Sequence, residues 1–399
     1  MDTSLLELND QRVVAEISLA NLRHNLKAIR QKLKPGVKLC PVVKANAYGH
    51  GAVRVAQTCQ AEGVEFFAVG CLSEAVELRE AGIKVPILIL GPTSPSRASW
   101  LYRYNLRQTV SSRQAALELA QALEATPRDA VKAVPEDYKI HLHLKLDTGM
   151  SRHGFRTASA EERESTIHDI LALQRDLAAY PQMEIEGLYT HFATNPHTDL
   201  AYFQRQVQRF VVVKEALDLA GCPIPLIHCS NSAASLTCPE LDFSMVRTGI
   251  MVYGSRDGDW MNEEIDLRYV MNFKGRISAI REVNAGEGIS YGHSYLAANK
   301  MRVGIVEAGY ADGLNRSLSN QVKFLVHDHL VPQVGKICMD RCMCDLSNCP
   351  EAQVGDQVLI FGDDERNDLQ VDYQADLVGT IPYELFCNIG PRVPRIYID

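Results

Sequence analysis

The sequence predicts an α/β fold with an N-terminal (β/α)8 TIM barrel followed by a mostly β C-terminal domain. The chain has 399 residues, a length that favours about two domains. Strand-like apolar runs alternate with helical stretches over roughly the first 250 residues, a length typical of one barrel. Beyond residue 263 the apolar runs are short, alternating and separated by Gly and Asn, which is typical of a β domain.

The barrel prediction depends on the order of its elements. Eight strand-like runs lie near 39–44, 65–70, 86–90, 106–110, 139–146, 184–190, 225–229 and 244–247. Helix-like stretches between them include 73–82, 113–124, 160–179 and 199–220. This alternation predicts a barrel. A doubly wound open sheet is the alternative, and the absence of G-x-G-x-x-G after the first strand disfavours it.

The two ends of the barrel region set the domain boundaries. Residues 11–17 alternate weakly and predict a short strand, and 18–33 predict a helix capped by Ser18. The polar segment 257–264 then marks a change of texture. We therefore predict a barrel domain over 11–263, whose first short strand could pack on the other domain, and a mostly β domain over 264–399. Expected elements of the second domain are strands near 276–280, 302–306 and 357–361 and a helix near 374–388.

Composition excludes several classes of protein. Hydrophobic residues make up 46% and charged residues 23% of the chain, which is ordinary for a globular protein. The formal net charge of −8 argues against nucleic-acid binding, which needs a basic face. No apolar run is long enough for a membrane span, and the acidic N-terminus lacks a signal peptide's basic region. We expect a cytoplasmic protein without nucleic-acid or membrane partners.

Eleven cysteines in such a chain favour free thiols over disulfides. Cys338, Cys342, Cys344 and Cys349 are spaced C-x3-C-x-C-x4-C, unlike the paired C-x2-C of zinc modules. We expect them to be small buried residues and expect no metal site.

Barrel active sites lie at the C-terminal ends of the strands, so the first candidate is Lys44. It ends an apolar run and precedes a small, turn-forming segment, 45–51. Lysine loses its proton readily when desolvated and forms Schiff bases with carbonyl cofactors. The alternative is a lysine that extends along the strand end and keeps its ammonium in water.

Other polar residues also follow strands. Tyr48 follows the first strand together with Lys44, and the later strands are followed by 145–152, His191, Asn231, Ser232 and 247–250. Each has a simpler interpretation, such as a core histidine, a surface ion pair or a helix cap. Ser232 at a helix start, with the Gly249 and Ile250 amides, suits a phosphate near strands 7 and 8. A lysine for an aldehyde and a cradle for a phosphate together indicate pyridoxal 5′-phosphate.

The sequence also resembles the alanine racemases, the barrel-type (fold type III) pyridoxal-phosphate enzymes. The matches run in the family's order through the whole chain: 43–51, 145–152, 190–192, 231–232, 247–254, 290–292, 309–313 with Arg316, 338–340, and Tyr383 with 392–395. That order is more specific than any single motif.

The resemblance implies roles for particular residues. Lys44 would hold the cofactor covalently and move the substrate's α-proton on one face, and Tyr291 of a second subunit would act on the other face. The phosphate would be held by Tyr48, Ser232, Gly249, Ile250 and Tyr383. Arg247 would face the pyridine nitrogen, with Asn231 also in the cofactor site.

The remaining roles concern the substrate and its surroundings. Arg152 and the backbone amide of Met339, from the partner, would bind the carboxylate. His191 and Arg316 would orient the cofactor and the tyrosine, and Tyr310 and Tyr383 would narrow the entrance. Lys145, Cys338 and Asp340 would be supporting residues. Lys145 stands where some members carry a carbamylated lysine, with an ordinary salt bridge as the alternative.

Chemical principles agree with these implied roles. Racemisation removes a proton from one face of a carbon and delivers one to the other, so it needs two acid–base groups. A free tyrosine has a pKa near 10, so Tyr291 needs positive charge nearby. Arg247 does not give up its proton, so it leaves a ring nitrogen unprotonated and favours racemisation over decarboxylation. Ser151 departs from the family's usual glycine.

We therefore expect a racemase, an isomerase that interconverts L- and D-alanine and supplies D-alanine for peptidoglycan precursors. It would work as a head-to-tail homodimer with shared active sites. A broad-specificity, serine or lysine racemase of the same fold is the main alternative, disfavoured by the two entrance tyrosines. A pyridoxal-phosphate carrier would lack the β domain, and a decarboxylase would carry a carboxylate in place of Arg247.

Overall fold

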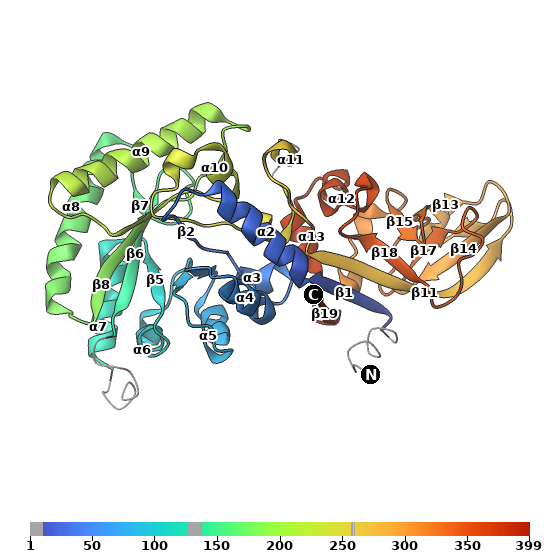
Figure 1. Cartoon of the computed structure of the whole chain (residues 1–399), viewed down its shortest axis with the longest axis horizontal. Coiled ribbons are helices and arrows are strands. Elements are labelled where there is room, and N and C mark those ends of the chain that lie inside the picture. Colours follow the sequence, from blue (N-terminus) through green and yellow to red (C-terminus); the bar gives the residue numbers. More distant parts are fainter. Residues whose placement is uncertain (1–10, 127–137, 257, 259) are drawn as a thin grey trace. The chain divides into compact units, whose positions relative to one another are not determined.

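The computed structural model describes residues 11–126, 138–256, 258 and 260–399 (Figure 1). The chain forms two compact units. The barrel unit consists of Leu26–Ala45 and Ala56–Gly249. The sheet unit consists of the N-terminal segment through Asn25, Asn46–Val55 and Ile250–Asp399.

The barrel unit is built on parallel strands. One sheet runs in the order β3 (Phe67–Val69), β4 (Ile87–Ile89), β5 (Arg107–Val110), β6 (Ile140–Asp147), β8 (Met183–Tyr189) and β9 (Leu226–His228). A parallel pair, β2 (Lys38–Leu39) and β10 (Met245–Val246), completes the set. The short β7 (Phe155–Arg156) pairs with the end of β6.

Backbone hydrogen bonds join that pair to both edges of the sheet. The amide of Val43 donates to the carbonyl of Ala68, 2.9 Å away, and so links the β2 segment to β3. The amide of Arg247 donates to the carbonyl of Ser230, 3.0 Å away, and so links the β10 segment to β9. Among the described residues, the eight predicted strands therefore close a parallel barrel, and the predicted fold class is confirmed.

Helices surround these strands (Figure 1). They are α5 (Leu72–Glu80), α6 (Ala98–Arg103), α7 (Arg113–Glu124), α8 (Ala160–Asp176), α9 (Leu200–Leu219) and α10 (Ser232–Thr237). Two more, α2 (Leu19–Lys32) and α4 (Ala52–Ala61), have residues in both units. Their starts follow local rules: the Ser18 hydroxyl accepts from the amide of Asn21, and Ser159 and Glu162 form a capping box on α8. The short α6 was not predicted.

The sheet unit contains an eight-stranded mixed sheet. Its strands are β1 (Val13–Ser18), β11 (Met271–Val283), β14 (Met301–Val306), β15 (Lys323–Val326), β16 (His329–Pro332), β17 (Cys342–Asp345), β18 (Gln357–Phe361) and β19 (Arg395–Ile398). A separate hairpin consists of β12 (Gly288–Ile289) and β13 (Tyr295–Leu296). The first strand, β1, pairs antiparallel with β11 and parallel with β19.

The predicted single helix near 374–388 is wrong. The segment forms two helices, α12 (Val371–Leu377) and α13 (Pro382–Asn388). Gly379 lies in the left-handed region with φ 68°, and Pro382 stands in the first turn of α13. Proline lacks the amide that a continuous helix would need, so the chain turns between the two helices.

The eleven cysteines are free thiols, as predicted. Cys342 and Cys344 alternate along β17 and are buried on the same face of the strand. Across the ranges that the structure describes, no helix is both long and apolar enough to span a bilayer.

Candidate active site

The segment from Lys44 to Tyr48 (α3) is a left-handed helical turn. Ala45, Asn46, Ala47 and Tyr48 have φ between 51° and 55°, a conformation that costs roughly 1–2 kcal/mol for each residue other than glycine. The Asn46 side chain steadies the end of the turn, because its Oδ1 accepts from the amide of Ala52 at 2.8 Å. Backbone strain of this kind occurs most often at functional sites.

Glu74 holds the start of this turn. Its carboxylate accepts from the amide of Ala45 at 2.7 Å and from the amide of Gly70 at 2.6 Å. The segments that follow β2 and β3 are thus tied together beside Lys44, and the side chain of Lys44 is half-buried there.

Five of the predicted residues share one electrostatic environment: Lys44, Lys145, Arg152, His191 and Arg247. Burial and then the charges of Arg152, Arg247 and Lys44 lower the pKa of Lys145 to about 8. Burial and then the same cations lower the pKa of His191 to about 3, so His191 is neutral at pH 7. The closed barrel therefore gathers basic groups from the ends of four different strands into one positive cluster, which suits an anionic ligand.

Arg247 is the most firmly held member of this cluster. It is buried, and its Nη1 donates to His228 Nδ1 (2.8 Å) and to the His228 carbonyl (2.9 Å). Its Nη2 donates to the carbonyls of Thr190 (2.8 Å) and Cys229 (3.3 Å), and its guanidinium lies 5.0 Å from the ring centre of Tyr189. The orientation of the guanidinium is therefore set by β8, β9 and β10 together.

The loops after β9 and β10 meet at Ser232. The Ser232 hydroxyl accepts from the amide of Gly249 at 3.0 Å, and the side chain is buried. Asn231 caps α10, since its Oδ1 accepts from the amide of Ala234 at 3.0 Å. Ile250, which follows Gly249, begins the short 3-10 helix η5 (Ile250–Tyr253).

Tyr48 and Tyr383 lie together in the sheet unit. Their ring centres are 5.5 Å apart, and the Tyr48 ring also lies 4.9 Å from that of Tyr253. The His50 ring stacks on the Tyr253 ring, with ring centres 4.5 Å apart. Tyr48 and Tyr383, the two tyrosines that the family resemblance implies for phosphate binding, therefore belong to one aromatic cluster.

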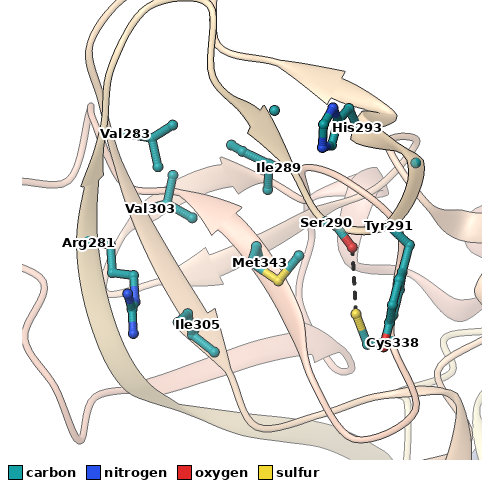
Figure 2. Close-up of a pocket in the computed structure, with 12 residues that line it drawn as sticks. Arg281, Val283, Ile289, Ser290, Tyr291, His293, Val303, Ile305, Cys338 and Met343 are labelled. Carbon is teal, nitrogen blue, oxygen red and sulfur yellow. Dashed lines mark hydrogen bonds between the residues drawn. The ribbon is translucent and has the colours of Figure 1, made fainter.

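Tyr291 projects from the β12–β13 hairpin and is 71% exposed. Figure 2 shows it beside Cys338 at one end of an apolar cavity of about 620 Å³. The preceding residue, Ser290, has φ 64°, and its hydroxyl donates to the carbonyl of Lys336 at 2.6 Å. That hydrogen bond holds the left-handed backbone that presents the tyrosine to solvent.

Tyr310 and Met339 are also exposed, by 42% and 53%, and a close backbone approach links them. The amides of Tyr310 and Ala311 donate to the carbonyls of Cys338 and Met339, each at 3.0 Å. A Cβ on Gly309 would lie 2.3 Å from the Met339 carbonyl oxygen, so glycine is required there.

Arg316 and Asp340 both lie in the sheet unit. Arg316 begins the 3-10 helix η8 (Arg316–Leu318) and is exposed. Asp340 pairs with Arg392 at 2.8 Å, and Arg392 also reaches the buried Asp312 at 3.0 Å. Ser151, the departure from the family pattern, has φ 57°, which explains why glycine suits that position.

Sequence reasoning missed His143 and Glu186, which connect to Arg247 through His228. The signal that could have found His143 is its phase, because it alternates with Lys145 along β6. Its link to Glu186 depends on strand pairing and has no signature in the sequence.

These features define a class: a parallel barrel that carries a lysine and a buried arginine at its strand ends, followed by a β domain with an exposed tyrosine. Family models sharpen the class. The model for the alanine racemase N-terminal domain matches residues 17–257, and that for the alanine racemase C-terminal domain matches residues 270–397. The chain therefore belongs to the alanine racemase family, as its motifs predicted.

Individual relatives agree over nearly the whole length. Alanine racemase of Desulfovibrio desulfuricans is 40% identical over 98% of this chain and 99% of its own length. Alanine racemase of Nostoc is 37% identical over 97% of this chain and 96% of its own length. Among solved structures, alanine racemase of Clostridium difficile 630 has a TM-score of 0.87 at 35% identity and covers 98% of this chain and 96% of its own. A Bacillus anthracis alanine racemase with bound L-Ala-P has a TM-score of 0.85 at 31% identity over 98% and 95%.

Proposed function

We propose that this chain is a pyridoxal-phosphate-dependent racemase that interconverts L-alanine and D-alanine. Membership of the alanine racemase family supports the reaction. The observation that carries the proposal is the positive cluster at the barrel's strand ends, where a half-buried lysine accompanies a fully held arginine.

The donor set fits the cofactor. The cluster of Lys44, Lys145, Arg152 and Arg247 suits a ligand with a phosphate, and Ser232 with the Gly249 amide offers a polar edge beside it. When bound, pyridoxal phosphate withdraws electrons from the substrate's α-carbon and so makes its proton easier to remove. We assign its binding to Lys44, Tyr48, His191, Asn231, Ser232, Arg247, Gly249, Ile250 and Tyr383.

Arg247 selects among the reactions that such a cofactor supports. Arginine has only donor groups and keeps its proton, so an aromatic nitrogen facing it remains unprotonated. That arrangement limits electron withdrawal and favours simple proton exchange over decarboxylation. The four acceptors around Arg247 hold it in one orientation for this task.

Proton exchange on two faces requires two groups. In our proposal Lys44 Nζ takes or returns the α-proton on one face, and the Tyr291 hydroxyl does so on the other. Arg152 and the Met339 amide bind the substrate carboxylate, and Tyr310 and Tyr383 restrict the side chain. Lys145, His191, Arg316, Cys338 and Asp340 support these groups.

The exposed position of Tyr291 suits delivery to a second subunit. We therefore propose a head-to-tail homodimer with shared sites. The domain bounds 11–263 and 264–399 remain a prediction from the sequence, and the compact units differ from them because β1 and residues 250–263 belong to the sheet unit. We also propose that the enzyme works in the cytoplasm and supplies D-alanine for peptidoglycan precursors.

A chiral assay tests the reaction. Purified protein with added pyridoxal phosphate would receive L-alanine, L-serine, L-lysine and L-arginine separately, and both enantiomers would be quantified. We expect alanine to approach equal amounts of D and L faster than the others. Preference for a larger side chain would contradict the restricted pocket, and no D-enantiomer from any substrate would contradict the racemase.

A further inference from the structure

A buried relay of hydrogen-bonded side chains, Arg247–His228–His143–Glu186, leads away from Arg247 through the interior of the barrel. Arg247 Nη1 lies 2.8 Å from His228 Nδ1, and His228 Nε2 lies 2.8 Å from His143 Nδ1. His143 Nε2 in turn lies 2.9 Å from Glu186 Oε2. Neither histidine has any exposed surface.

The two ends of the relay favour the same direction for each hydrogen bond, because arginine only donates and an ionised carboxylate only accepts. Arginine only donates, so His228 Nδ1 must accept and its proton must sit on Nε2. His228 Nε2–H then donates to His143 Nδ1, which places the proton of His143 on Nε2, and His143 donates to the carboxylate of Glu186. Burial lowers the pKa of both histidines, which agrees with neutral rings.

The strand register and a glycine in the barrel leave room for the rings of this relay. The pairing of β6 with β8 shifts register between Leu142 and His143 and sets His143 opposite Gly187. A Cβ at position 187 would lie 2.3 Å from His143 Nδ1, so only glycine leaves room for the ring. Tyr189 stacks on the His228 ring with centres 4.8 Å apart and planes at 9°.

Glu186 is the anionic end of the relay. Arg107 Nε lies 3.3 Å from its carboxylate, and His141 lies 3.7 Å away. Although burial acts to raise the pKa of Glu186, the His143 hydrogen bond and the nearby Arg107 charge hold it below its ordinary value. The neighbouring acid on the same face of β8, Glu184, pairs with Lys139 and His141 instead.

We propose that Glu186, acting through His143 and His228, is a positioning residue for Arg247. By accepting from His143, Glu186 selects the tautomer of each histidine that presents a lone pair to the guanidinium. The opposite tautomers would point the Nδ1–H of His228 at the N–H of Arg247 and turn the arginine away. The expected effect of Glu186 on the rate of racemisation rests on the proposed function. The histidine tautomers do not, because they depend only on residues of this protein.

Histidine tautomers are read directly by NMR of protein labelled with ¹⁵N in the histidine rings. Assignment would use the variants His143→Gln and His228→Gln. In the wild-type protein without cofactor we expect both rings to be neutral with the proton on Nε2 throughout neutral pH. Protonation of either ring, or a proton on Nδ1, would overturn the proposal.

Variants of Glu186 test its part in the relay. Glu186→Leu removes the acceptor, and Glu186→Gln keeps an acceptor oxygen without the charge. We expect Glu186→Leu to give mixed tautomers at His228 and to lower kcat about tenfold with KM little changed. We expect Glu186→Gln to restore part of the wild-type tautomer population and part of the lost kcat. Glu184→Gln is the matched control, and melting temperatures would confirm that each variant is folded.

A second measurement separates positioning from general damage. In an Arg247→Lys background, Glu186→Leu should have little additional effect on kcat, because Glu186 acts on the reaction only by positioning Arg247 through the relay. Multiplicative effects, or a Glu186→Leu variant with wild-type tautomers, would refute the relay. A wild-type protein that racemises nothing but shows the expected tautomers would contradict the proposed function and leave the relay standing.

Discussion

Asp242 should make the stability of the protein depend on pH, because it is a buried carboxylic acid that contacts no opposite charge among the described residues. It follows the 3-10 helix η4 (Pro239–Leu241) and has no exposed surface. Neither carboxylate oxygen has a hydrogen-bond partner among the described residues, and the nearby Ser230 hydroxyl donates to the carbonyl of Leu241 instead. Burial raises the pKa of Asp242 to about 7.

This shift makes the protein less stable as pH rises. Between about pH 4, where an unfolded aspartate loses its proton, and about pH 7, the folded state holds a proton that the unfolded state has released. The free energy of unfolding therefore falls across this window and levels off above it. A change from about 3.9 to about 7 corresponds to at most about 4 kcal/mol.

The substitution Asp242→Asn keeps the shape of the side chain and removes its ionisation. We expect the variant to exceed the wild type in free energy of unfolding by up to about 4 kcal/mol at pH 8, and to match it closely near pH 4. Urea denaturation at several pH values measures this difference. The control is Asp218→Asn, an exposed acid paired with Lys214 on α9, which should change stability by less than about 1 kcal/mol.

The result that refutes this reasoning is a constant difference between Asp242→Asn and the wild type at every pH. It would mean that the carboxylate is ionised and compensated in the folded state.

Four further predictions concern the site. Lys44→Ala should fold normally by circular dichroism but lose the absorption band of covalently bound cofactor; a retained band would exclude Lys44 as the attachment point. Tyr291→Phe should lower kcat/KM for racemisation in both directions by about 10²-fold or more, while Lys44 still exchanges the α-proton of one enantiomer with deuterium from D₂O; exchange that is equal for both enantiomers would contradict its one-face role. Gly187→Ala should destabilise the fold by about 1–3 kcal/mol, because its Cβ would meet the His143 ring at 2.3 Å; an unchanged melting temperature would contradict this. If Lys145 is carbamylated, ¹³C-bicarbonate should produce a carbamate NMR signal that grows as pH rises through about 8, where its amine becomes neutral, and that is lost in Lys145→Met; its absence would favour an ordinary cation.

Local patterns in the sequence were enough to predict most elements. The alternation of apolar strands with helices predicted the barrel, because burial on both faces of a parallel strand requires a continuous apolar run. Lys44 could be singled out for the same reason, since a charge at the end of such a run is unusual. The late helix was misjudged because apolar spacing continued across Gly379 and Pro382, which turn the chain.

The backbone of the Lys44 segment was beyond such reasoning. The residues Ala45–Tyr48 have no composition that requires positive φ, and their left-handed turn is maintained by hydrogen bonds such as those of Asn46 and Glu74. Contacts of this kind exist only after the surrounding segments have packed.

The sequence by itself determined which residues follow each apolar strand segment and how side chains alternate within it, because apolar runs and a period of two can be read along the chain. Only the tertiary structure decided which of those residues meet. The positive cluster exists because β2 pairs with β10 and closes the barrel, and the path from Arg247 to Glu186 exists because a register shift sets His143 against Gly187. Register and closure are set by the packing of all the strands at once, so no local pattern encodes them.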